Sequence, residues 1–295
     1  MKGLQLSQKE SEAYGRTMMD EQFPDTAEQM AAGLVGYGSE CLGFDDEISR
    51  DHDFGPSFCI WLPREIYVRC GEAVRAAYDA LPKTFLGFSE RVEQEQGRGR
   101  VGVLCLEDFY REMIGRETLP GTDAEWLVIP EEALATATGG SVFEDRLGRF
   151  SAFREGLLQY YPESVWRRKL ADSLAKAAQA GQYNYARAMQ RGERVAAELA
   201  LGEFVRESMH LVYLLNRVYA PFYKWMHRGL RTLPTGGEIG DMLALLYQTD
   251  SESDRILIIE AVCNVLVQIL QEKGLSAEQD NFLQNHIGII LSETF

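Results

Sequence analysis

The sequence predicts an α+β protein, with a small β-sheet in its first half and a helical bundle in its second half. Short apolar runs alternate with stretches of helical spacing up to about residue 145. Beyond that point, apolar residues recur at intervals of three and four positions. The change of pattern predicts two domains, residues 1–150 and residues 151–295. With 295 residues and 45% hydrophobic content, the chain is long enough to bury a sizeable core.

The first domain combines helices with short strands. A helix is predicted from about Glu10 to Met30, and a second one over residues 64–81, where Pro82 ends it. The predicted strands are Leu34 to Tyr37, the run DFGPSFCIWL at residues 53–62, KTFLGF at residues 83–88 and RVGVLCL at residues 100–106. This order is typical of helices packed around a small sheet.

The second domain is predicted to be helical throughout. One helix covers residues 164–181 and ends at Gly181, and a long helix covers residues 183–220, where Pro221 ends it. Two further helices follow, with cap signatures at Ser251 and Ser276. The pattern therefore predicts a helical bundle.

Charge disfavours nucleic acid as a partner. The chain has 30 basic and 45 acidic residues, a formal net charge of -15, which repels a phosphate backbone. A polyanionic ligand therefore needs a local cationic patch or metal ions.

We expect a cytoplasmic protein that does not span a membrane. The longest apolar run, Ile256 to Leu270, is interrupted by polar residues and is too short for a membrane span. The polar N-terminus lacks the apolar core of a secretory signal. Five cysteines without a CxxC pair fit a reducing compartment and disfavour a structural zinc site.

Two features of residues 35–53, VGYGSECLGFDDEISRDHD, point to phosphate chemistry. Gly36 and Gly38 can take backbone angles closed to other residues, and Ser39 offers a hydroxyl and an N–H to a phosphate. A helix starting near Glu40 would turn its N-terminus toward the same group. Each feature alone is common in solvated turns, so their combination carries the hypothesis.

Asp51 and Asp53 predict a metal site. If residues 51–58 begin a strand, the two carboxylates share one face, with Cα atoms about 6.5 Å apart, and His52 points to the opposite face as a structural residue. Two close carboxylates need a cation, and Mg²⁺ prefers such oxygen ligands together with substrate phosphates. Two such ions could be bridged by the pair.

The motif GYGSECLGFDDEISRDHDF resembles the signature of the DNA polymerase β-like nucleotidyltransferase superfamily. Together with GQYNYAR and LLNRVYAPFYKW, it is similar to a bacterial family of unknown function that joins such a domain to a helical C-terminal domain. The resemblance covers residues 30 to 235 and implies the layout of the kanamycin-type and minimal nucleotidyltransferases, with a small mixed sheet. By position, Gly38 and Ser39 match the phosphate turn, and Asp51 and Asp53 match the metal ligands.

The superfamily pattern includes a third carboxylate on a neighbouring strand. RVGVLCLED has none before Glu107, so Glu107 is the candidate, as metal ligand or general base. The alternative is an acidic residue in the first turn of a helix, where the helix dipole favours it.

Three cations of the second domain are candidate nucleotide contacts. Arg187 and Arg191 recur, with Arg194, on one face of the predicted long helix and could reach a triphosphate, or they could form a solvated face paired with glutamates. Lys224 follows a helix break, and the resemblance implies that this region faces the cleft.

The leading hypothesis is a Mg²⁺-dependent nucleotidyltransferase. It would transfer an NMP, AMP in the first instance, from ATP or another NTP to a hydroxyl of a small molecule or protein and release pyrophosphate. The alternative is a catalytically weak or inactive nucleotide-binding protein, such as an antitoxin-like regulator.

Overall fold

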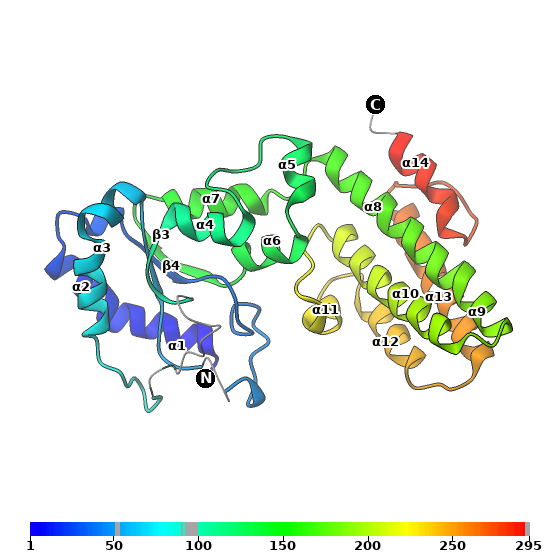
Figure 1. Cartoon of the computed structure of the whole chain (residues 1–295), viewed down its shortest axis with the longest axis horizontal. Helices are drawn as coiled ribbons and strands as arrows, with labels where there is room; N and C mark the ends of the chain where they lie inside the picture. The colour runs from blue at the N-terminus through cyan, green and yellow to red at the C-terminus, as the bar shows by residue number, and fades with distance from the viewer. Residues whose placement is uncertain (51–53, 90, 92–99, 293–295) are drawn as a thin grey trace. The chain divides into compact units, whose positions relative to one another are not determined.

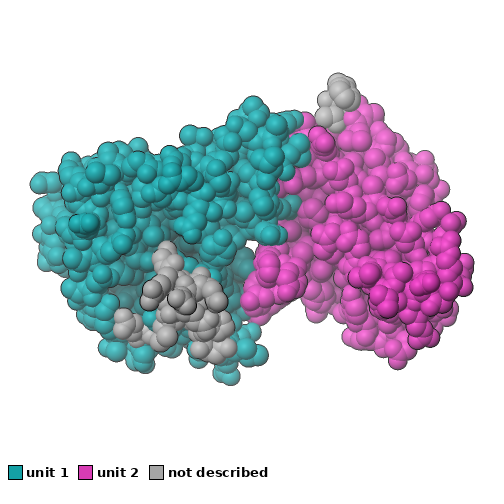
Figure 2. Space-filling model, in the orientation of Figure 1, with its two compact units in different colours: residues 1–159 teal, residues 160–295 magenta. Residues whose placement is uncertain are grey.

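The structure is a computed structural model that describes residues 1–50, 54–89, 91 and 100–292. The chain divides into two compact units, Met1–Gln159 (unit 1) and Tyr160–Phe295 (unit 2), drawn in teal and magenta in Figure 2. Residues 151–159, which the sequence pattern assigned to the helical domain, lie in unit 1. None of the helices in the described part of the chain is long and apolar enough to cross a membrane.

Unit 1 is a mixed α/β structure, as the sequence predicts, built on a four-stranded sheet (Figure 1). The strand order is β3-β2-β1-β4; β2 and β3 are parallel, and β1 is antiparallel to both β2 and β4. The strands are β1 Ala31–Leu34, β2 Cys59–Leu62, β3 Gly102–Cys105 and β4 Ser141–Asp145. The helices are α1 Gly3–Glu10, the π-helical η1 Ser11–Gly15, α2 Arg16–Gln22, the 3₁₀ turns η2 Ala27–Gln29 and η3 Ile48–Arg50, α3 Arg64–Asp79, α4 Leu106–Ile114, α5 Asp123–Val128, α6 Glu131–Thr138 and α7 Arg149–Leu158.

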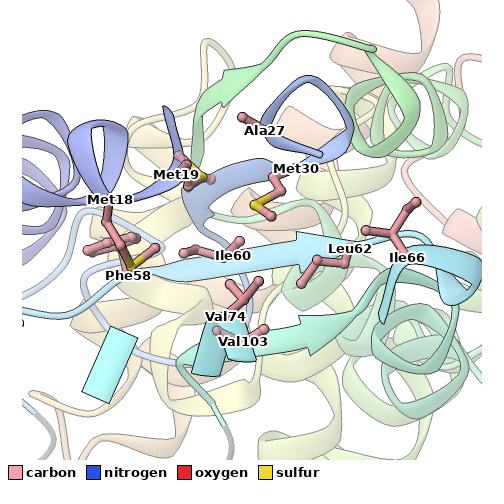
Figure 3. Packing of buried hydrophobic residues seen from close by; sticks show 11 residues of the cluster. Met18, Met19, Ala27, Met30, Phe58, Ile60, Leu62, Ile66, Val74 and Val103 are labelled. Atoms are coloured by element: carbon pink, nitrogen blue, oxygen red, sulfur yellow. The ribbon is translucent and has the colours of Figure 1, made fainter. Parts of the chain in front are cut away.

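Strand β2 lies in the centre of the sheet and is buried on both faces. Ile60 and Leu62 pack with Met18 and Val74 on one face, in the apolar cluster of Figure 3. On the other face, the Trp61 ring stacks on Phe150 with ring centroids 3.9 Å apart. This burial explains why the run is apolar at every position instead of alternating.

Four sequence predictions for unit 1 are wrong in detail. The N-terminal helix runs from Gly3 to Gln22 and not from Glu10 to Met30. The first strand ends at Leu34, where the chain turns, and the predicted strand at residues 83–88 is a reversal. Leu86 and Gly87 have φ of 48° and 82°, and Phe85 and Phe88 exchange backbone hydrogen bonds, which is hairpin-turn geometry. No helix starts near Glu40, because residues 39–43 form turns.

Unit 2 consists of helices only in its described part, as expected for the second domain. Its helices are α8 Glu163–Ala177, the π-helical η5 Ala178–Tyr185, α9 Ala186–Gln190, α10 Arg194–Leu215, α11 Tyr223–Leu230, α12 Gly237–Leu246, α13 Glu252–Glu272, the 3₁₀ turn η6 Leu283–His286 and α14 Ile287–Ser292. Helix α8 and η5 pack along α10 (Figure 1). The Trp166 indole donates a hydrogen bond to the Leu214 carbonyl at 2.8 Å, which ties α8 to the end of α10.

The structure differs from the predicted helices of unit 2 at two glycines. Gly181 does not stop a helix: the chain stays helical through Gln190, and a Cβ at residue 181 would lie 2.3 Å from the Phe204 ring. The absence of a side chain at Gly181 therefore lets α10 pack closely against η5. The predicted long helix instead breaks at Gly192, whose left-handed φ of 73° ends α9. Ser251 caps α13 through the Asp254 N–H, whereas no helix begins at Ser276.

Candidate functional site

The turn of residues 35–39 directly follows β1 and has the backbone geometry that its glycines suggest. Gly36 has a φ of 127° and Gly38 a φ of 120°, angles that L-residues rarely adopt. A Cβ on Gly38 would also lie 2.5 Å from Glu40 Oε2. Both positions therefore require glycine, and the turn is a specified conformation rather than a loose loop.

A buried ion pair holds this turn in place. The Arg91 guanidinium lies 3.0 Å from Glu40 Oε1 and also donates to the Ser57 hydroxyl at 3.3 Å. The side chains of Arg91 and Glu40 are 5% and 9% exposed, so both charges are removed from water. The pair neutralises the carboxylate that lies against Gly38, which keeps the turn compatible with an anionic ligand.

Ser39 combines an engaged carbonyl with an available hydroxyl. Its carbonyl accepts hydrogen bonds from the N–H groups of Leu42 and Phe44, at 3.2 and 2.8 Å. Among the described residues, no hydrogen-bond partner is present for the half-buried Ser39 hydroxyl. The side chain can thus donate to a ligand without breaking the turn.

A cavity of about 340 Å³ opens beside the turn, which we call the turn cavity. Its lining includes Val35, Gly36 and Tyr37 of the turn, together with residues from β3 and α4. Tyr37 is 48% exposed, and the Arg100 guanidinium lies over its ring at 5.3 Å. An exposed aromatic ring beside a cation suits a ligand with a flat base and a phosphate.

The acidic rim of the turn cavity is partly neutralised. The Asp108 carboxylate lies 2.9 Å from the Arg64 guanidinium, and this hydrogen bond lowers the pKa of Asp108. Arg64 also pairs with Glu117 at 2.9 Å. These ion pairs are solvent-exposed, so they contribute little to stability but set the local charge.

Glu107 lies in the first turn of α4 and binds another helix. Its Oε2 accepts a hydrogen bond from the backbone N–H of Arg64 at 2.9 Å, at the start of α3. The Cys105 thiol lies 3.4 Å from the same oxygen. The carboxylate therefore stabilises the N-terminus of α3, whose N-cap residue Pro63 offers no side-chain cap.

Asp51 and Asp53 lie outside the described residues, as does His52. The described part of the predicted strand, residues 54–58, is not β-structure, and β2 begins only at Cys59. Residues 54–58 therefore give no support to the expectation that the two carboxylates lie on one face of a strand. Gly55, with a φ of 152°, and Pro56 interrupt the run before the strand.

The donor set predicted for the metal consists of carboxylates, which suit Mg²⁺ chemically. Within residues 1–50, 54–89, 91 and 100–292, no group of three or more His, Cys, Asp or Glu side chains is arranged to hold a metal ion. A metal at Asp51 and Asp53 thus remains a prediction from the sequence.

The cations predicted to contact the nucleotide all belong to unit 2. Arg187 lies on α9 and Arg191 in the turn after it, so they do not share one long helix with Arg194, which begins α10. Arg187 and Arg191 border a groove of about 490 Å³ between η5, α9 and α10. Lys224, in the first turn of α11, is exposed and lies 5.2 Å from the Trp225 ring.

Sequence reasoning missed Tyr37, Arg91 and Arg100 as parts of the site region. Arg91 and Arg100 are far from the glycine turn in sequence and reach it only through the fold. Tyr37 stands between the two glycines, and an aromatic residue inside a phosphate turn was an available signal.

Comparison with known proteins finds a family model that matches part of the chain and a distantly similar solved structure. A family model described as a domain of unknown function (DUF4037) matches residues 126–226. No curated protein matches. Among solved structures, the chain is similar to a nucleotidyltransferase-like protein from Exiguobacterium sibiricum 255-15, with a TM-score of 0.37 and 14% identity, over 96% of this chain and 79% of that chain. A likeness this distant leaves the activity of the present chain to be argued from its own residues.

Proposed function

We propose that the chain is a Mg²⁺-dependent nucleotidyltransferase that moves a nucleoside monophosphate, AMP in the first instance, from an NTP to a hydroxyl group on a small molecule or a protein. The observation that carries the proposal is the specified turn of residues 35–39, with positive φ at Gly36 and Gly38, beside the turn cavity. Asp51 and Asp53, which follow in the sequence, add the carboxylates that the chemistry needs.

Tyr37, Gly38 and Ser39 of the turn have separate tasks in this proposal. The backbone at Gly38 allows close approach of the phosphates, and the Ser39 hydroxyl donates to one of their oxygens. The Tyr37 ring packs against the base, and Arg100 beside it offsets phosphate charge. Asp51 and Asp53 would hold Mg²⁺, which supplies charge neutralisation for the triphosphate when bound.

The transfer exchanges one P–O bond for another. The acceptor oxygen bonds to the α-phosphorus, the bond between the α-phosphorus and the bridging oxygen breaks, and pyrophosphate leaves with the electron pair. Glu107, the predicted third carboxylate, takes the hydroxyl proton in this scheme. Arg187, Arg191 and Lys224 stay predictions as triphosphate contacts.

Transfer of label from α-labelled ATP to a panel of hydroxyl-bearing acceptors, with Mg²⁺ present, tests the activity. The proposal expects labelled product with the native chain and none with Asp51→Ala or Asp53→Ala. Glu47→Ala is the matched control, because Glu47 is an exposed acid of the same segment with no side-chain partner among the described residues. Unchanged transfer in both aspartate variants would exclude their role as metal ligands.

A nucleotide-binding protein without efficient transfer is the second candidate. The engagement of Glu107 by the Arg64 N–H favours it, because a carboxylate that already serves a helix end is less available as a base. Glu107→Gln separates the candidates, since the amide oxygen can still accept that hydrogen bond. Loss of transfer with unchanged nucleotide affinity supports the enzyme; binding of Mg²⁺-ATP by the native chain without transfer to any acceptor supports the second candidate.

A further inference from the structure

The first half of helix α10 has an exposed apolar face in addition to the face that it buries. Ala197, Leu201 and Phe204 are fully buried against the other helices of unit 2. Val195 and Leu199 lie one helical turn apart on the other side and are 77% and 71% exposed. A helix on the surface of a bundle needs one apolar stripe, so the packing of unit 2 does not account for this exposed pair.

The groove of about 490 Å³ between η5, α9 and α10 lies beside this exposed face, and we call it the α10 groove. Leu199 is one of its lining residues. Its other apolar lining residues are all alanines, Ala180, Ala188, Ala196 and Ala200. Side chains this small let a further helix come close to the backbone of α10.

The charged residues that line the α10 groove are three cations and one acid. Lys176, Arg187 and Arg191 are exposed, and none of them forms an ion pair with another described residue. Glu203 is the acid, and the Arg206 guanidinium donates to both of its carboxylate oxygens, at 2.7 and 2.8 Å. The negative charge of the lining is therefore compensated, whereas its positive charge is not.

The neighbours of the groove leave this positive charge in place. The Arg187 guanidinium lies over the Tyr183 ring at 4.0 Å, a contact that holds the side chain without neutralising it. Neither Asp172 nor Glu193, the exposed acids nearest in sequence to these cations, lines the groove. A local excess of cations in a chain of net charge -15 attracts an acidic partner that the rest of the surface repels.

Shape and charge together select the kind of partner. A small anion would use the cations but would leave the exposed Leu199 and the alanines uncovered. A basic segment would be repelled by the three cations. An amphipathic helix with acidic residues beside its apolar stripe satisfies both features, and the apolar stripe of such a helix commonly binds in a groove between helices.

We propose that the α10 groove is the docking site for an acidic amphipathic helix of a partner protein. The apolar stripe of that helix covers Leu199 and the alanines, and its carboxylates pair with Lys176, Arg187 and Arg191. This role is an alternative to the triphosphate contacts predicted for the two arginines, and it does not depend on nucleotidyl transfer.

Binding of a labelled helical peptide of about 20 residues to the full chain, measured by fluorescence anisotropy, tests the proposal. The peptide has leucine and alanine on one face and glutamate at the flanking positions. We expect the native chain to bind it, and Leu199→Asp and the double variant Arg187→Gln/Arg191→Gln each to weaken binding about tenfold or more. Leu257→Asp and Arg168→Gln, at exposed positions of α13 and α8, are the matched controls and should bind as the native chain does.

Two further peptides separate the contribution of charge from that of shape. A peptide with lysine in place of glutamate should not bind, and a peptide of the same composition whose leucines no longer share one face should bind about tenfold more weakly. Absence of binding by the acidic peptide, or equal affinity in the native chain and Leu199→Asp, would overturn the proposal. Equal affinity for the rearranged peptide would overturn it as well, because charge alone would then account for binding.

Parallel measurements test two other occupants of the groove. In calorimetry with Mg²⁺-ATP, Arg187→Gln/Arg191→Gln should behave as the native chain does; a loss of ATP affinity would assign the arginines to the triphosphate and overturn the proposal. In sedimentation, self-association of the native chain that Leu199→Asp abolishes would assign the groove to a second copy of this chain and overturn it too. Circular dichroism spectra confirm that the variants are folded.

Discussion

The Arg91 guanidinium and the Glu40 carboxylate form a buried ion pair at 3.0 Å that fixes the glycine turn after β1. Removing one partner leaves an uncompensated buried charge. Arg91→Met should therefore lower the free energy of unfolding by about 3–5 kcal/mol, and adding Glu40→Leu should restore most of the loss.

Chemical denaturation of the single and double variants measures this coupling. Arg149→Met is the matched control, because Arg149 pairs with Glu65 on the surface of the same unit and should change stability by at most about 1 kcal/mol. Equal losses in Arg91→Met and Arg149→Met would contradict the account of the turn.

Gly38→Ala should destabilise the chain more than Gly43→Ala. Both glycines have positive φ, 120° and 72°, so both substitutions strain the backbone. Only at residue 38 does the new Cβ collide with a neighbour, the Glu40 carboxylate at 2.5 Å, whereas no atom lies within 4 Å at residue 43. Thermal unfolding should show the larger loss for Gly38→Ala, by about 1 kcal/mol or more. Equal melting temperatures for the two variants would show that the carboxylate does not press on the turn.

Gly181→Ala and Gly202→Ala should change stability in opposite directions. Both glycines lie inside helical segments, yet a Cβ at residue 181 would lie 2.3 Å from Phe204, while residue 202 has open space. We expect a loss of about 1–3 kcal/mol for the first and a gain of about 0.5–1 kcal/mol for the second. The denaturant concentration at the midpoint of unfolding, compared with that of the native chain, measures both changes. A Gly181→Ala variant that is more stable than the native chain would contradict the close packing of η5 against α10.

Glu10 should make the chain less stable as the pH rises toward 7. Burial raises its pKa from 4.5 to about 7, so between these values the folded chain holds a proton that the unfolded chain has lost. Its contribution is fully present below about pH 4.5 and is lost as the pH rises through 7. Compared with Glu10→Gln, the native chain should lose up to about 3 kcal/mol over this range.

Unfolding curves from pH 5 to pH 8 measure that difference, with Glu12→Gln as the control because Glu12 is an exposed glutamate of the same N-terminal segment. A difference between the native chain and Glu10→Gln that stays constant with pH would show that Glu10 titrates alike in both states.

Glu107→Ala should lower stability by about 0.5–2 kcal/mol, because the Arg64 N–H at the start of α3 loses its acceptor. Glu107→Gln should change stability little, since its amide oxygen can still accept this bond. Glu112→Ala, at an exposed position of the same helix, is the control. Equal stability of Glu107→Ala and the native chain would show that Glu107 does not stabilise the N-terminus of α3.

Much of the fold was predictable from local patterns, and the misses arise where a tertiary contact or a weak pattern decides the structure. The apolar run at β2 and the helical spacing of α3 were readable, because burial on both faces and on one face leave distinct periodicities. Gly181 was misread as a helix end because sequence alone cannot distinguish a glycine that ends a helix from one that admits a ring such as Phe204. Strand β4 was missed, as its partly exposed residues SVFED give no clear alternation.

Some features of the candidate site were likewise predictable from the sequence, and others depend on contacts between distant residues. The positive φ of Gly36 and Gly38 follows from residue type and was expected. The contact of Arg91 with Glu40 joins residues distant in sequence, and its geometry depends on how the chain folds. The unpartnered oxygen of Glu10 likewise has no signature in the sequence, because burial of a single glutamate in a polar N-terminal stretch is set by its neighbours in space.

Binding of a non-hydrolysable ATP analogue, measured by calorimetry with and without Mg²⁺, tests the central claim most directly. The account predicts Mg²⁺-dependent binding to the native chain and to the control Glu47→Ala, and its loss in the double variant Asp51→Asn/Asp53→Asn. Equal affinity in the native chain and the double variant would contradict the assignment of the two aspartates and the glycine turn to one metal-nucleotide site.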